Sequence, residues 1–172
     1  MSLRGLLGLL GALSLLAWPA GAATTATSGG LRLAFEPPAK WVAVADRPAG
    51  VLALFRPSGV KRFPHLTVTE GDPGTPTEVL ERVRRSLPAL FRDLGLKGAE
   101  ILQEPRLLSG SGPDRVEVAY SGELGEAACD WVQVIVPRAD GCLVFTFALP
   151  RGTLTQWQGA LSAFAGSLKA RP

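Results

Sequence analysis

The stretch at residues 127–149 constrains the fold of this chain more than any other part of the sequence. Two runs rich in Val, Ile and Phe flank the dipeptide Asp140-Gly141, the strongest short-range signal for an antiparallel β-hairpin. With Asp140 and Gly141 as the loop, Ala139 faces Cys142 across the two strands. Successive side chains of a strand point to opposite faces. One face of the hairpin therefore carries Val132, Val134, Val136, Leu143, Phe145, Phe147 and Leu149.

The opposite face of this hairpin is also largely apolar. It carries Trp131, Gln133, Ile135, Val144, Thr146 and Ala148. A pair of strands that is apolar on both sides belongs in the interior of a covered sheet, because a solvated face would alternate with polar residues. We therefore expect the hairpin at the centre of the sheet, with another layer packed on each face.

The beginning of the chain has the pattern of a secretory signal peptide. Arg4 supplies a positive charge, an apolar run follows, and residues 20–22 read Ala-Gly-Ala, an Ala-x-Ala cleavage site. The apolar run is shorter than the ~20 residues that cross a bilayer. The sequence predicts a signal peptide at 1–22, cleavage near Ala22, and a soluble periplasmic or secreted protein with no retained transmembrane segment. A retained membrane anchor is the alternative.

Residues 23–30 are small and polar and predict a flexible lead-in.

Charge and size place the rest of the chain in one ordinary domain. The sequence has 18 Lys and Arg against 15 Asp and Glu, a formal net charge of +3. Nucleic-acid-binding domains concentrate basic residues on one face, and nothing in this nearly balanced sequence requires such a concentration. We expect no nucleic-acid partner. The length predicts a single domain over residues 31–170.

The two cysteines are predicted to be free. Cys142 adjoins the hairpin turn, whereas Cys129 lies about ten residues up its strand, which at ~3.3 Å per residue separates them by on the order of 30 Å. A disulfide needs a Cα separation of at most ~7 Å. We therefore expect no intramolecular Cys129–Cys142 disulfide, and two half-buried packing residues instead. The sequence has one histidine and no Cys-x-x-Cys, so we expect no metal site and no cofactor.

Two segments carry the signals of amphipathic helices. Residues 75–78, Thr-Pro-Thr-Glu, combine an N-cap threonine, a proline at the first helical position and the glutamate of a capping box. An apolar stripe at helical spacing follows as far as Leu94, and Pro88 inside it predicts a kink or a break. Residues 153–156 repeat the capping pattern with glutamine, and this second helix is expected to reach about Lys169.

Short alternating apolar segments predict the strands. They lie at 30–35, 41–45, 51–56, 66–69, 99–109 and 115–120, besides the two strands of the hairpin. Most neighbours are joined by short turns, which favours antiparallel pairing, and two helices are needed to cover two apolar faces. The predicted fold is α+β, a single-domain α/β/α sandwich. Its mainly antiparallel sheet of about six to eight strands is covered by the two amphipathic helices.

This layout and several of its residues resemble the PsbP-like superfamily, which includes DcrB-type bacterial envelope proteins. The resemblance covers most of residues 31–169. It rests on Phe35-x-Pro37 followed by Trp41, Leu54-Phe55, Pro64-x-Leu-Thr-Val68, Phe145-Thr-Phe147, and the segment from Trp157 to Leu168. It implies an α/β/α sandwich and a role in binding or assembly rather than catalysis. The chain departs from DcrB-type proteins in lacking their lipidated cysteine, and no functional motif is shared.

One loop carries the candidate site residues. Arg56, Lys61, Arg62 and His65 could together form an anion- or partner-binding patch, or simply an ordinary solvated loop. His65 is the only side chain with an unperturbed pKa between 5 and 8. A Ser-His-acid site would also need a nucleophile elbow, and no Gly-x-Ser-x-Gly occurs. We therefore assign no catalytic residue.

Three functional hypotheses follow from the sequence. The first is an exported, non-enzymatic accessory or binding protein of the cell envelope, whose partner is another envelope protein. The second is a carrier of a small apolar ligand or lipid, held in a pocket between a helix and the sheet. The third is a hydrolase built on His65.

Overall fold

The computed structural model describes residues 23–110 and 112–172. The predicted signal peptide and its cleavage site at Ala22 lie outside the described residues. In chain order the elements are β1 (Thr24–Ser28), β2 (Leu31–Phe35), β3 (Trp41–Ala43), β4 (Val51–Pro57), β5 (His65–Glu70), α1 (Pro76–Asp93), β6 (Lys97–Gly110), β7 (Gly112–Leu124), β8 (Ala127–Arg138), β9 (Gly141–Pro150), α2 (Leu154–Ser167) and β10 (Lys169–Arg171).

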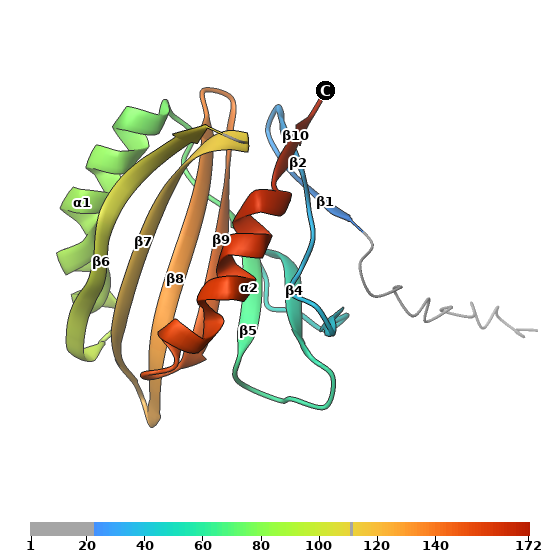
Figure 1. Cartoon of the computed structure of the whole chain (residues 1–172). Coiled ribbons are helices and arrows are strands. Elements are labelled where there is room, and N and C mark those ends of the chain that lie inside the picture. The colour runs from blue at the N-terminus through green and yellow to red at the C-terminus, as the bar shows by residue number, and fades with distance from the viewer. Residues whose placement is uncertain (1–22, 111) are drawn as a thin grey trace, which may run out of the picture.

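The architecture is the predicted α+β sandwich. Seven strands of the described chain form one antiparallel sheet in the order β3-β4-β5-β9-β8-β7-β6, and three more form a smaller sheet in the order β1-β2-β10. Helix α1 covers one face of the large sheet, and α2 lies on the other face beside the small sheet (Figure 1). None of the helices within residues 23–110 and 112–172 has the length and apolar character needed to cross a membrane.

The central hairpin is formed by β8 and β9, which occupy the middle of the large sheet as predicted. Its predicted register was wrong, because Arg138 pairs with Gly141 and the two loop residues are Ala139 and Asp140. Gly141 is needed in the ladder, since a Cβ there would lie 1.8 Å from the Ser28 carbonyl oxygen. Moving the loop by one residue moves the pairing by two, so each side chain stays on its predicted face.

The N-terminal segment is a strand and not the predicted flexible lead-in. Strand β1 pairs antiparallel with β2, and its Thr24, Ala26 and Ser28 side chains are buried. The β1–β2 turn also docks on the central hairpin, where Gly30 N–H donates to the Asp140 carbonyl oxygen at 3.0 Å. The polar character of these residues predicts a linker, but their small size permits this close contact.

The α2 face of the sheet holds the larger core. Its buried aromatic residues come from β2, β3, β4, β9 and α2. Phe164 of the helix has its ring centroid 5.2 Å from that of Phe145 and 4.9 Å from that of Phe147. On the α1 face, Val79 and Leu87 of the helix are buried against β7, β8 and β9. The two faces of the central hairpin are thus both covered, as its sequence predicts.

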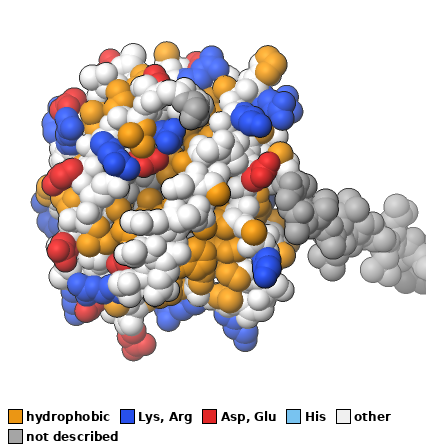
Figure 2. Space-filling view, in the orientation of Figure 1, with side chains coloured by type: hydrophobic (Ala, Val, Ile, Leu, Met, Phe, Trp, Pro, Cys, Tyr) orange, Lys and Arg blue, Asp and Glu red, His pale blue; other side chains and the backbone are white. Residues whose placement is uncertain are grey.

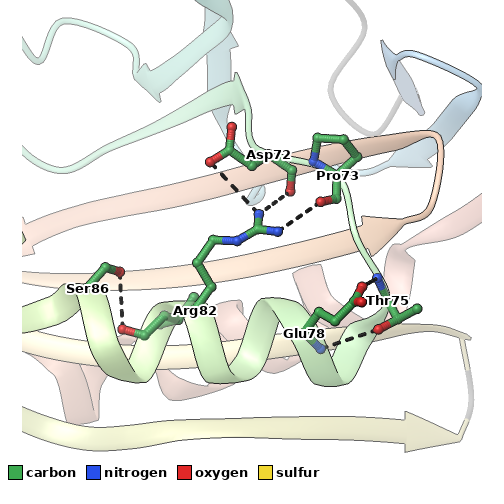
Figure 3. A network of polar contacts seen from close by, with 7 residues as sticks. Asp72, Pro73, Thr75, Glu78, Arg82 and Ser86 are labelled. Carbon is green, nitrogen blue, oxygen red and sulfur yellow. Dashed lines mark hydrogen bonds and ion pairs between the residues drawn. The ribbon is translucent and has the colours of Figure 1, made fainter.

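Helix α1 begins as its sequence predicts. Glu78 N–H donates to Thr75 Oγ1 at 3.3 Å and Thr75 N–H donates to Glu78 Oε2 at 2.8 Å, which completes the capping box. Arg82 ties the same end to the preceding loop, donating to the carbonyl oxygens of Asp72 and Pro73 at 2.9 and 3.0 Å (Figure 3). The helix does not break at Pro88 but continues to Asp93, because burial of its apolar stripe outweighs the cost of an internal proline.

Replacing Thr75 by alanine is expected to lower the free energy of unfolding by about 1 kcal/mol, the usual effect of losing an N-cap side chain. The Thr75→Ser variant keeps the accepting hydroxyl and should stay close to the wild type. Urea unfolding monitored by circular dichroism measures both values. Equal loss in the two variants would mean that the hydroxyl contributes nothing to the helix start.

Helix α2 begins at the predicted place but without the predicted cap. The Thr153 hydroxyl donates to the Pro150 carbonyl oxygen at 2.6 Å and makes no capping hydrogen bond to the helix. The turn before the helix is held instead by the buried Asp130, whose Oδ2 accepts from Gly152 N–H at 2.8 Å. The helix ends at Ser167, and β10 follows where helix was predicted as far as Lys169.

Both cysteines are free, as the hairpin spacing predicts, but they are fully buried and not half-buried. Cys142 pairs with Pro137, eight residues along β8 from Cys129, a separation of about 26 Å at ~3.3 Å per residue. Burial raises the pKa of the Cys142 thiol to about 11 and that of the Tyr120 phenol to about 12.

Stability is therefore expected to fall as the pH rises above about 9. The unfolded chain releases its thiol proton near pH 9 and its phenol proton near pH 10, before the folded chain does. Because the unfolded state has then lost protons that the folded state keeps, the free energy of unfolding falls by up to about 1.4 kcal/mol for each unit of pKa difference. Urea midpoints at pH 8 and pH 10.5 measure this loss. Cys142→Ala should reduce the loss, and an unchanged pH dependence in that variant would contradict the assignment.

Candidate functional site

The structure brings the four predicted site residues together at the β4–β5 connection, with Arg56 in β4, Lys61 and Arg62 in the loop, and His65 at the start of β5. Arg56 Nη1 donates to the Lys61 carbonyl oxygen at 2.7 Å, and His65 Nδ1 lies 2.8 Å from the Arg62 carbonyl oxygen. The Lys61 and Arg62 side chains are exposed, whereas Arg56 and His65 are half-buried. Arg56, Lys61, Arg62 and His65, here called the loop cluster, form a surface with more positive than negative charge.

The surroundings of His65 hold its ring without offering a reaction partner. The ring stacks on Phe63 with centroids 5.2 Å apart. Burial lowers the pKa of His65, the backbone hydrogen bond to Arg62 opposes this, and the charge of Arg56 lowers the pKa further. His65 is thus expected to be neutral at neutral pH. In the described ranges, no three His, Cys, Asp or Glu side chains are grouped so that they could hold a metal ion.

A second site, which the sequence did not locate, is a groove between α2 and the sheet. The groove has a volume of about 470 Å³. Its floor is formed by small and apolar side chains of β7 and β8, and one side of α2 forms a wall. The lining residues are Gln103, Arg106, Leu108, Arg115, Glu117, Ala119, Val132, Val134, Leu154, Gln158, Leu161, Ser162, Ala165 and Gly166.

The groove exists because α2 is offset toward one half of the sheet. Phe164 anchors the helix over β9 and β2, through Phe145, Phe147 and Phe35. Strands β6 and β7 therefore extend beyond the helix on the same face (Figure 1). Figure 2 shows hydrophobic side chains beside α2 on this face, with basic and acidic side chains next to one another toward β6 and β7.

Three charged side chains line the β6–β7 side of this groove. Arg115 Nε lies 2.9 Å from Glu117 Oε1, and Arg106 Nη2 lies 3.2 Å from Glu117 Oε2. The side chains of Glu117 and Arg115 are only 14% and 18% exposed, whereas that of Arg106 is 55% exposed. Two guanidinium groups thus face one carboxylate. We call Arg106, Arg115 and Glu117 the arginine cluster.

Strand alternation and one irregularity of β6 assemble this cluster. Along β7, residues 115, 117 and 119 point to the α2 face, while Val116 and Val118 are buried under α1. Arg106 is the cross-strand partner of Glu117. An apolar floor with a few convergent polar groups is the usual composition of a small-molecule site, and guanidinium groups bind carboxylates and phosphates with paired hydrogen bonds.

Neither a protein-family model nor a curated protein matches the sequence, but solved structures do. The solution structure of cyanobacterial PsbP (CyanoP) from Synechocystis sp. PCC 6803 is 16% identical with a TM-score of 0.60, over 96% of this chain and 99% of that one. The crystal structure of LpqN, involved in cell envelope biogenesis of Mycobacterium tuberculosis, is 12% identical with a TM-score of 0.58, over 88% and 91%.

A crystal structure from Bacteroides thetaiotaomicron VPI-5482 is also similar, at 12% identity and a TM-score of 0.54. It matches 81% of this chain and 45% of the longer one. At such identities the likeness is one of fold.

Proposed function

The chain has a PsbP-like fold, and on this premise we propose that it is an exported accessory protein of the cell envelope that acts by binding and not by catalysis. The envelope role is supported by the signal-peptide pattern at residues 1–22 and by the fold shared with LpqN, a protein involved in cell envelope biogenesis. The binding role is supported by a groove whose lining is largely unreactive. The hydrolase hypothesis has less support, because the contacts of His65 are a carbonyl oxygen and a phenyl ring.

The observation that carries the proposal is the groove of about 470 Å³ beside α2. Its volume lies within the ~300–1,000 Å³ of small-molecule sites. Ala119, Val132 and Val134 give it an apolar floor, and Leu154 and Leu161 an apolar wall. In the proposed role the protein carries a small apolar or amphiphilic ligand in this groove.

Native mass spectrometry of the protein purified from its envelope fraction tests this role. A carrier retains ligand, so the spectrum should contain a species heavier than the polypeptide, which loses the added mass on denaturation. The Ser162→Trp variant, which fills the groove from an exposed position on α2, should lose that species while circular dichroism stays unchanged. A folded wild-type protein with only the polypeptide mass would contradict the carrier role.

The loop cluster is the proposed contact for an envelope protein. The exposed Lys61 and Arg62 supply positive charge at one end of the sheet, and their carbonyl oxygens hold the side chains of Arg56 and His65. The double change Lys61→Glu and Arg62→Glu should abolish recovery of any partner cross-linked to the wild-type protein in envelope extracts. The control Arg92→Glu, on the exposed side of α1, should not. Equal recovery by both variants would remove the loop cluster from the proposal.

The export step has its own test. The protein recovered from the envelope fraction should begin at Ala23 when its N-terminus is sequenced, because cleavage follows the Ala-Gly-Ala of residues 20–22. A protein that retains Met1 would point to the membrane-anchor alternative.

A further inference from the structure

We propose that the groove takes an amphiphile with a single acyl chain and an anionic headgroup, and that the arginine cluster binds the headgroup. This inference rests on the proposed function, since it names the class of ligand that the same groove would carry. It follows from three features of the groove: an excess of positive charge at one end, an apolar floor, and a limited volume.

The excess positive charge lies on the β6–β7 side of the groove, where the headgroup is proposed to bind. Glu117 engages Arg115 through Nε and Arg106 through Nη2. A guanidinium carries five N–H donors, and within the part of the chain that the structure describes these two have no other hydrogen-bond acceptor. Two positive groups against one carboxylate leave a net positive charge in a place that is partly shielded from water. A second anion would balance this charge, with the paired hydrogen bonds that guanidinium groups favour.

The apolar floor extends from this cluster along β7 and β8. Glu117 is paired with Val134 on β8, and Ala119, two residues further along, is paired with Val132. From Arg115 to Ala119 the arginine cluster and the floor together span four residues of β7, roughly 13 Å at ~3.3 Å per residue. Figure 1 shows α2 running alongside, from its first turn at the lower end of β8 to β10 at the top. Its Leu154 and Leu161 side chains line the same groove.

The volume of the groove favours a ligand with one acyl chain. About 470 Å³ is toward the lower end of the ~300–1,000 Å³ of small-molecule sites. The side of the groove lined by the half-buried Gln103 and the exposed Gln158 leaves the ligand partly accessible from solvent, so that it can enter without opening the core. In the proposed complex the headgroup lies against Arg106 and Arg115, and the acyl chain lies on Ala119 and Val132.

Isothermal titration calorimetry with probes of one chain length tests the inference. The probes are dodecanoate and dodecyl phosphate, which carry an anionic headgroup, 1-monododecanoylglycerol, which carries the same chain without charge, and acetate, which has no chain. All are used below the concentrations at which they form micelles. At least one anionic amphiphile should bind about tenfold or more tightly than the neutral one, the size expected for a charge-assisted hydrogen bond. Acetate should not bind measurably.

Variants then assign the headgroup site. Arg106→Gln changes a side chain that is largely exposed, so the fold should persist, and it should reduce the affinity for the anionic amphiphile several-fold without affecting the neutral one. Arg115→Gln should reduce the affinity for the anionic amphiphile more than Arg106→Gln does. Glu117→Gln removes the competing carboxylate and should increase that affinity. Arg92→Gln, which removes an equal charge on the α1 side, is the control and should change neither affinity.

The outcomes separate the two claims. Equal affinity for the charged and neutral amphiphiles, or an effect of Arg92→Gln as large as that of Arg106→Gln, would overturn the headgroup assignment and leave the carrier role standing. Binding of acetate as tight as that of dodecanoate would mean an anion site with no acyl chain, and would overturn the inference. Failure of the folded protein to bind any amphiphile would contradict the proposed carrier role itself.

Discussion

Replacing Gly141 by alanine is expected to lower the free energy of unfolding by about 3 kcal/mol or more, at the upper end of overpacking effects. A Cβ at this position would lie 1.8 Å from the Ser28 carbonyl oxygen and 3.1 Å from Leu31 Cβ. The first of these is a backbone atom in a hydrogen-bonded turn, which cannot move aside as a flexible side chain would. The β1–β2 turn must therefore separate from the central hairpin.

Chemical unfolding of the variant measures this effect. Gly159→Ala is the matched control, because Gly159 lies within α2 with open space around its Cα, and alanine there should stabilise the helix by about 0.5–1 kcal/mol. The same substitution thus has opposite signs at the two sites. If Gly141→Ala were as stable as the wild type, the N-terminal hairpin would not be docked on the central one.

Replacing Phe164 by alanine is expected to cost about 3–5 kcal/mol, the range for truncation of a buried aromatic side chain. Phe164 is 2% exposed, and its ring packs edge-on against Phe35, Phe145 and Phe147. These contacts join α2 to both sheets at once. The variant should therefore lose the helix position as well as stability, and with it one wall of the groove.

The control for Phe164→Ala is the same substitution at a phenylalanine whose ring is less buried. Phe63→Ala, on the β4–β5 loop, removes only the stacking partner of His65 and should cost less than about 1.5 kcal/mol. Unfolding midpoints of both variants, with near-ultraviolet circular dichroism to report aromatic packing, give the result. Similar losses in the two variants would contradict the assignment of Phe164 as the residue that fixes α2 on the sheet.

The elements predicted best from the sequence are those with local signals. The capping box at residues 75–78 and the alternation around Asp140-Gly141 each lie within a few residues, and both are found in the structure. The sequence did not predict β1, because its small, polar residues lack an apolar alternation, or β10, because its pairing partner is not local. Each is short, and each is ordered by pairing with β2, which for β10 means a partner distant in the sequence.

The sequence predicts that a pocket can exist but not where it lies. A pocket between a helix and an apolar sheet follows from the hairpin, but its position depends on how far α2 is offset, and this is set by the packing of Phe164. The sequence predicts residues 115 and 117 as strand residues. It does not predict which β6 residue pairs with Glu117, because the pairing cannot be obtained by counting residues back from the β6–β7 turn. An unbroken ladder from the Gly110–Gly112 pair would place Pro105 opposite Glu117, and the single register shift between Leu108 and Gly110 brings Arg106 there instead.

One signal in the sequence could have indicated the site. Arg115 and Glu117 alternate onto the same face as the apolar Ala119, next to Val132 and Val134 of the neighbouring strand. Charged side chains directed at an otherwise apolar, covered face are costly unless they are paired or bind something. The likeness in fold to CyanoP and LpqN does not supply this information, because a fold does not determine the site that it carries.

The most direct test of the groove as the binding site is a titration of the isotope-labelled protein with dodecanoate, followed by backbone amide chemical shifts. We predict that the shifts concentrate on the residues that line the groove, with Ala119, Val132 and Ser162 among the most affected. Amides of the exposed side of α1, such as those of Glu81 and Arg85, should stay unchanged. Shifts confined to α1 or to the β4–β5 loop, or spread evenly over the chain, would contradict the account.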